Sequence, residues 1–150
     1  MTILIKNKQR KITIKSGLLK KNIQQILNHI GYTDYDIGIW ITTNATIRKF
    51  NKKYRKKDTA TNVLSFPFYT NLKPNEKIKP QSDVEKILGD IIISAEFVKN
   101  EAQTIWNRTF DEHLNAIIIH GICHLLGYTH QADYDFKKMQ KKEAELLKLL

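Results

Sequence analysis

The segment from Asp111 to Leu126 constrains the fold most, because it is a strongly apolar stretch of helical length. It predicts a helix that is apolar on most of its faces, as buried helices are. A second apolar segment, Gly89 to Ser94, is typical of a buried strand. Together they predict a core helix packed with a small sheet.

The rest of the chain adds elements of both kinds. Alternating apolar residues predict one or two early strands, at 3–5 and 12–14, a strand at 37–41, and a short strand at 63–66 that ends at Pro67. Helical spacing predicts helices from Ser16 to Gly31, from Thr43 or Asn44 to Tyr54, from Ala95 to Trp106, with Ile105 facing inward, and from Ala132 or Asp133 onward. Residues 69–86 carry two prolines and predict a surface loop. The order predicts an α+β fold with a small mixed sheet packed with helices, in one domain over 1–150.

Composition indicates the kind of partner and the cellular compartment. The 150 residues include 25 Lys and Arg against 15 Asp and Glu, so the net charge is +10. Such a surface attracts nucleic acid, an acidic membrane face or an acidic partner. A single cysteine, Cys123, excludes an internal disulfide and favours a reducing compartment. No apolar run is long enough to span a bilayer, and residues 1–8 lack a signal-peptide core. We therefore expect a cytoplasmic protein without membrane association.

The most informative motif is HGICHLLGYTH, from His120 to His130. His120 and His124 are four residues apart, so a helix places them on one face, where they can share a metal ion. Gly127 lets the chain leave the helix, and His130 can then return as a third ligand. Three histidines with an open position are typical of catalytic zinc, so we expect one Zn²⁺ per chain.

The same spacing occurs in metzincin peptidases, which leaves a metallopeptidase as one alternative. Those enzymes carry a glutamate general base directly after the first histidine, and here that position is Gly121. A second alternative is a non-catalytic protein that binds RNA or the ribosome and holds a structural zinc. The sequence alone does not separate this second alternative from an enzyme.

A basic segment lies at residues 48–57, where seven of ten residues are Lys or Arg. Phe50 and Tyr54 alternate with the basic side chains, which suits binding of a phosphate backbone with base stacking. Candidate RNA contacts are Lys49, Lys52, Lys53, Lys56 and Lys57. Arg55 precedes a turn into a strand, and its guanidinium suits a phosphate or the charge of a phosphoryl transition state.

The histidine motif resembles that of the bacterial YbeY family. The resemblance extends over most of the chain, because two other segments occur in the family's order: Tyr54-Arg55 through Thr61-Asn62-Val63-Leu64-Ser65-Phe66-Pro67, and Leu88-Gly89-Asp90-Ile91. The family's motif usually has Asp before the last histidine, and Thr129 stands there in this chain. We therefore expect that a carboxylate able to orient a histidine is absent.

The resemblance implies a zinc-dependent endoribonuclease that is directed to single strands. Such an enzyme acts in ribosomal RNA maturation, including 16S rRNA 3′ end processing, and in ribosome quality control. By this resemblance, zinc binds His120, His124 and His130, Arg55 matches a required arginine, and His113 matches an upstream histidine with a candidate catalytic role. Implied partners are ribosomal RNA precursors, the small ribosomal subunit and assembly factors. The attacking group is open between metal-activated water and the RNA 2′-OH.

Overall fold

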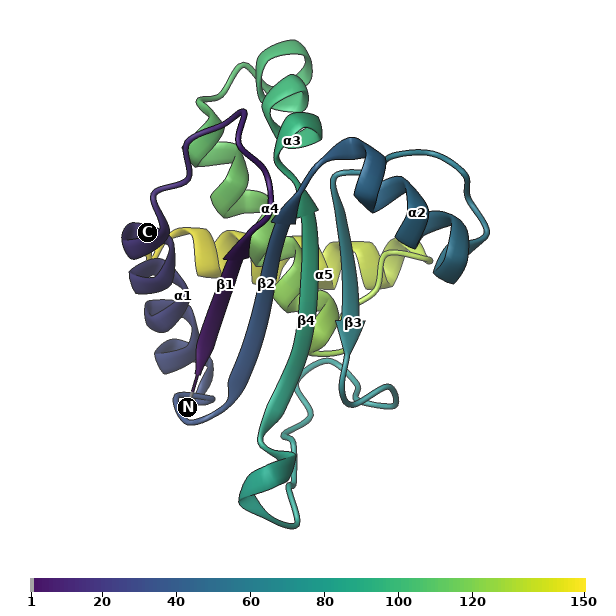
Figure 1. The fold of residues 1–150 in the computed structure, drawn as a ribbon. Helices are drawn as coiled ribbons and strands as arrows, with labels where there is room; N and C mark the ends of the chain where they lie inside the picture. Colours follow the sequence, from purple (N-terminus) through teal and green to yellow (C-terminus); the bar gives the residue numbers. More distant parts are fainter. Residues whose placement is uncertain (1) are drawn as a thin grey trace.

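A four-stranded sheet organises the computed structural model, which describes residues 2–150 (Figure 1). The strand order is β1-β2-β4-β3. Strands β1, β2 and β4 are parallel, and β3 runs antiparallel to β4. Their bounds are β1 Ile3–Asn7, β2 Asp36–Thr42, β3 Val63–Pro67 and β4 Ile87–Ser94. The predicted α+β fold with a small mixed sheet is confirmed.

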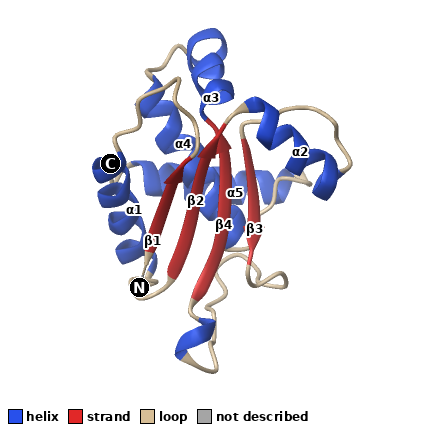
Figure 2. Ribbon diagram, in the orientation of Figure 1, coloured by secondary structure: helices blue, strands red, loops and turns tan. Residues whose placement is uncertain are grey.

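The helices lie mostly on one side of the sheet, with α4 and α5 behind it and α1 beside β1 (Figure 2). No helix in residues 2–150 combines the length and the apolar character needed to cross a membrane. The α-helices are α1 Ser16–Ile30, α2 Asn44–Arg55, α3 Ala95–Glu101, α4 Phe110–Leu125 and α5 Asp133–Leu147. Two shorter elements are the 3₁₀ helix η1 Asp83–Glu85 and the π-helix η2 Ala102–Trp106.

The main core lies between the sheet and α1, α4 and α5. Alternate residues of the parallel strands point into it, and the register aligns Ile3 with Ile37 and Ile39 with Ile91. Helix α4 is buried over most of its length, as its apolar sequence predicts. This packing holds α4 rigidly against the sheet, and α4 carries the first two histidines of the motif.

Helix α2 packs on the other face of the sheet. Its Ile47 is fully buried and forms a small second cluster with Leu64 of β3 and Ile92 of β4. The side chain of Thr43 caps the start of α2 by accepting a hydrogen bond from the Thr46 N–H at 3.4 Å. This docking brings the C-terminal end of α2 beside β3.

Of the one or two early strands predicted, only β1 forms, because the segment at residues 12–14 is a loop. The side chain of Gln9 satisfies the backbone there. Its amide nitrogen donates to the Ile12 carbonyl at 2.7 Å, and its amide oxygen accepts from the Ile12 N–H at 2.9 Å. Ile12 and Ile14 are partly buried against the core, so their alternation reflects loop packing without strand pairing.

The inward position predicted for Ile105 is wrong, because this side chain is 68% exposed. The predicted helix from Ala95 to Trp106 changes at Ala102 from an α-helix to a π-helix. A π-helical turn holds more residues than an α-helical turn, so later side chains rotate away from the expected face. Val98, in α3, and Ala102, the first residue of the π-helix, are buried as predicted.

Candidate metal centre

Helix α4 carries the first two histidines of the site, and a side-chain cap fixes where this helix begins. The Thr109 side chain accepts a hydrogen bond from the Glu112 N–H at 3.2 Å and donates one to the Glu112 carboxylate at 3.0 Å. Four turns of helix follow, and His120 and His124 lie on one face near its C-terminal end. The two imidazole rings are 4.6 Å apart between centroids.

Gly127 returns the chain toward this face. It has a φ of +94°, a conformation that favours glycine, and a Cβ at this position would collide with the backbone carbonyl of Leu72. Three residues later, the His130 ring lies 5.1 Å from the His124 ring and 5.7 Å from the His120 ring. The predicted clustering of the three histidines is confirmed: one ligand atom from each lies within 4.8 Å of the others.

The hydrogen bonds of the first two histidines define which nitrogens are free. The Nδ1 of His124 lies 2.9 Å from the Tyr128 carbonyl, and the Nδ1 of His120 lies 3.0 Å from the Glu143 carboxylate. Both partners are acceptors, so each Nδ1 carries the proton and donates it. In the neutral rings each Nε2 therefore presents a lone pair, and the two Nε2 atoms face each other at 3.1 Å.

A metal ion bound by both Nε2 atoms would lie between them. Two nitrogens bound to one tetrahedral zinc at about 2.0–2.1 Å are about 3.3 Å apart, close to the observed separation. Burial, reinforced by the neighbouring His120, lowers the pKa of His124 to about 4. His124 is therefore neutral at pH 7, the form in which imidazole binds a metal ion. The donor set fits a metal such as zinc.

The carboxylate expected to be missing is supplied from another helix. Thr129 is exposed and holds no carboxylate, as its sequence dictates. Glu143 of α5 instead reaches His120 across the α4–α5 contact. The expectation of an absent orienting carboxylate is therefore wrong, because the partner comes from packing between helices that lie apart in sequence.

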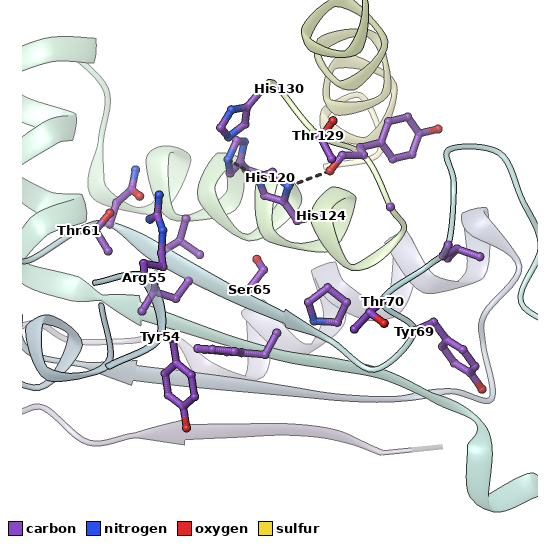
Figure 3. A pocket seen from close by; sticks show the side chains of 18 residues that line it. Tyr54, Arg55, Thr61, Ser65, Tyr69, Thr70, His120, His124, Thr129 and His130 are labelled. Atoms are coloured by element: carbon purple, nitrogen blue, oxygen red, sulfur yellow. Dashed lines mark hydrogen bonds between the residues drawn. The ribbon is translucent and has the colours of Figure 1, made fainter. Parts of the chain in front are cut away.

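A cavity of about 710 Å³ opens beside the three histidines and is lined by the end of α2, by β3 and by the loop after α4. Figure 3 shows Arg55 on the α2 side of this cavity and the histidines on the α4 side. Arg48, on the same helix, pairs with Asp58 at 2.8 Å, whereas no ion pair within residues 2–150 involves Arg55. The structure thus brings an unpaired guanidinium and the histidines to one cavity.

The position after His120 has no room for a peptidase-type base. A Cβ on Gly121 would lie 2.9 Å from Cδ1 of Ile91 and 3.1 Å from its Cγ2, so this position faces β4. A glutamate there would point into the sheet and away from the cavity. The geometry therefore argues against the metallopeptidase alternative independently of the missing carboxylate.

His113 is not brought into the cavity. It lies two turns before His120 on α4 and is only 2% exposed, between Glu101 and Arg108. Burial lowers the pKa of His113, against the opposing effect of Glu101. A catalytic role for His113 stays a prediction, and its burial away from the cavity argues against contact with a substrate.

The five candidate lysines are exposed on α2 and in the turn that follows it. None of them lines the cavity, but the neighbouring Tyr54 and Arg55 do. Helix α2 ends where Lys56 adopts a left-handed conformation with a φ of 61°. A hydrogen bond of 2.9 Å from the Asn51 side chain to the Thr59 carbonyl then holds the loop toward β3. The basic surface is thus continuous with the rim of the cavity.

Sequence reasoning missed three polar groups of the site. No sequence pattern predicts the contact of Glu143 with His120, since only the packing of α5 on α4 brings the two side chains together. The Tyr128 carbonyl is a backbone group whose direction depends on the turn at Gly127. Ser65 lines the cavity and donates from its hydroxyl to the Gly121 carbonyl at 3.3 Å, which links β3 to α4.

The α+β fold places three histidines that could hold a metal ion beside an open cavity, and this arrangement is typical of catalytic metal sites. The family model of the endoribonuclease YbeY matches residues 4–150. Human endoribonuclease YbeY is 33% identical over 147 residues, which are 98% of this chain and 87% of the human protein. The Aquifex aeolicus endoribonuclease YbeY is 33% identical over 149 residues, or 99% and 91% of the two chains. This chain belongs to the endoribonuclease YbeY family.

The fold comparison agrees with this assignment. The solution structure of a protein from Thermotoga maritima superposes with a TM-score of 0.65 at 26% sequence identity. The match covers 99% of this chain and 88% of the other. The sequence-based resemblance to the family is confirmed.

Proposed function

We propose that this chain is a zinc-dependent endoribonuclease that cuts single-stranded segments of ribosomal RNA precursors, including the 3′ end of 16S rRNA. The observation that carries the proposal is the shared cavity of Arg55 and the histidine triad. The name of the relatives described above, endoribonuclease, supports RNA as the substrate. The cytoplasmic location and the ribosomal partners expected from the sequence remain predictions.

His120, His124 and His130 would hold one zinc ion per chain. Bound zinc supplies Lewis acidity, which stabilises negative charge on a phosphoryl oxygen. Within residues 2–150, these three form the only group of three or more histidine, cysteine or acidic side chains whose ligand atoms lie close enough to share a metal ion. Three protein ligands beside an open cavity are typical of catalytic zinc, whereas structural zinc has four. This contrast favours an enzyme over a non-catalytic RNA-binding protein.

Arg55 would bind the scissile phosphate. Among residues 2–150 no carboxylate pairs with its guanidinium, whose paired N–H donors match two phosphate oxygens. Tyr54, 54% exposed at the cavity rim, offers an aromatic face for a neighbouring base. The exposed lysines Lys49, Lys52, Lys53, Lys56 and Lys57 would attract the RNA backbone toward this rim.

The experiment is cleavage of a single-stranded ribosomal RNA fragment by the wild-type protein, Arg55→Ala and Arg48→Ala. Arg48 is the matched control, since it lies on the same helix and pairs with Asp58 outside the cavity. We expect Arg55→Ala to lower kcat at least about 100-fold, in the range seen when a transition-state donor is removed. Equal rates for all three proteins would contradict the assignment of Arg55.

The ends of the products identify the attacking group. A 2′,3′-cyclic phosphate indicates attack by the neighbouring 2′-OH of the RNA, and a simple monophosphate indicates attack by water. Absence of cleavage by a metal-loaded wild-type protein would overturn the endoribonuclease proposal and favour RNA binding without catalysis.

A further inference from the structure

Glu143 is the one acidic side chain that contacts the histidine triad among the described residues. Its carboxylate lies 3.0 Å from Nδ1 of His120, and both side chains are less than one-third exposed. The position is set by packing, because Met139 and Leu146 on the same face of α5 are buried in the core. Glu143 lies between them at helical spacing, so the docking of α5 holds its carboxylate against α4.

The two histidines of α4 donate their Nδ1–H hydrogen bonds to different kinds of acceptor. The His124 Nδ1–H donates to a neutral backbone carbonyl, that of Tyr128, whereas the His120 Nδ1–H donates to a charged carboxylate. A carboxylate partner both fixes the tautomer and raises the basicity of the opposite nitrogen more than a carbonyl does. His130 is exposed and is supported by neither kind of partner among the described hydrogen bonds.

We propose that Glu143 is a positioning residue that fixes the Nε2-free tautomer and the orientation of His120, and thereby sets the metal affinity of the triad. It replaces, from α5, the carboxylate that Thr129 does not provide. The inference rests on the metal site of the proposed function and adds a residue outside the histidine motif. It also implies that metal affinity depends on the docking of α5.

The first test is zinc affinity, measured by competition with a chromogenic chelator. We expect Glu143→Leu to weaken zinc binding about 10–100-fold, the usual effect of losing such a partner. Glu143→Gln keeps an acceptor oxygen but loses the charge, so its affinity should lie between those of Glu143→Leu and wild type. Glu145→Gln is the matched control: Glu145 lies on the same helix but pairs with His29 and Lys142, and its affinity should equal that of wild type.

The second test reads the tautomer of His120 directly, without activity or bound metal. Nitrogen-15 NMR of the imidazoles should show the proton on Nδ1 of His120 in the metal-free wild type. Glu143→Leu should shift this signal toward a mixture of tautomers, whereas Glu145→Gln should leave it unchanged.

The outcomes separate this inference from the proposed function. Wild-type zinc affinity and an unchanged His120 tautomer in Glu143→Leu would overturn the inference while leaving the metal site intact. A wild-type protein that binds no zinc would instead contradict the metal site itself. Should Glu143→Leu fail to fold, Glu143→Gln decides: weakened binding supports the inference, and affinity equal to wild type overturns it.

Discussion

The contact between α4 and the sheet predicts that Gly121→Ala destabilises the protein. Alanine has higher helix propensity than glycine by about 1 kcal/mol, so an open helical site would gain stability. At this site, however, the new Cβ would lie 2.9 Å, 3.1 Å and 3.3 Å from Cδ1, Cγ2 and Cγ1 of Ile91. Ile91 is fully buried in the centre of β4 and has little room to move.

The magnitude follows from these two opposing effects. Overpacking a tight core costs about 1–3 kcal/mol, which offsets the gain in propensity and leaves a net loss of about 1 kcal/mol. For a chain of this size, that loss lowers the melting temperature by about 3 °C. The change also pushes α4 away from the sheet, so the histidine pair moves relative to Arg55.

A double-mutant cycle isolates the contact. Ile91→Val removes Cδ1, the atom nearest to the added Cβ, and alone should cost about 1 kcal/mol. In the Gly121→Ala background, the same change relieves the clash, so it should cost at least about 0.5 kcal/mol less. Urea unfolding of the metal-free proteins at pH 7 measures all four variants. Additive effects, or a Gly121→Ala protein about 1 kcal/mol more stable than wild type, would contradict a steric clash between residue 121 and Ile91.

Three further predictions use other parts of the molecule. Burial lowers the pKa of His113, so below about pH 6.5 the unfolded chain takes up a proton there that the native protein does not, and the free energy of unfolding falls. His113→Asn should flatten this pH dependence, measured by urea unfolding between pH 7 and 5. An identical slope in the variant would contradict a contribution from His113. Replacing Lys52 and Lys53 by Ala should weaken binding of single-stranded RNA and reduce the slope of log K against log salt concentration by about 1.4. Fluorescence anisotropy measures both effects, and an unchanged slope would show that α2 does not contact the RNA. Burial raises the pKa of the Cys123 thiol to about 12, so a thiol reagent should modify it only after unfolding, and rapid native labelling would contradict its packing.

Local sequence patterns were sufficient to predict most helices and strands of the fold. Helix α4 and strand β4 follow from their apolar runs, and α1 ends at Gly31, which has a φ of +83°. A second early strand at 12–14 does not form, because the alternation there is also compatible with a loop whose backbone is satisfied by Gln9. A side chain can thus replace a neighbouring strand as a hydrogen-bonding partner, and a pattern of apolar residues does not distinguish the two.

The site was predictable where the chemistry is local in sequence. The spacing of His120, His124 and His130 around Gly127 contains the geometry of the triad, because helix periodicity and one left-handed residue determine it. Glu143 was not predictable, since its contact with His120 depends on how α5 packs against α4. The burial of His113 likewise depends on Glu101 and Arg108, which surround it from the preceding segment.

We propose that RNA cleavage by this protein requires a metal ion held by the histidine triad. The most direct measurement compares wild type with His124→Ala, using metal content and cleavage of one single-stranded ribosomal RNA fragment on the same preparations. We expect about one metal ion per chain and cleavage for the wild type, and neither for His124→Ala. Equal cleavage by both proteins would contradict it, as would a wild type that holds metal and never cuts.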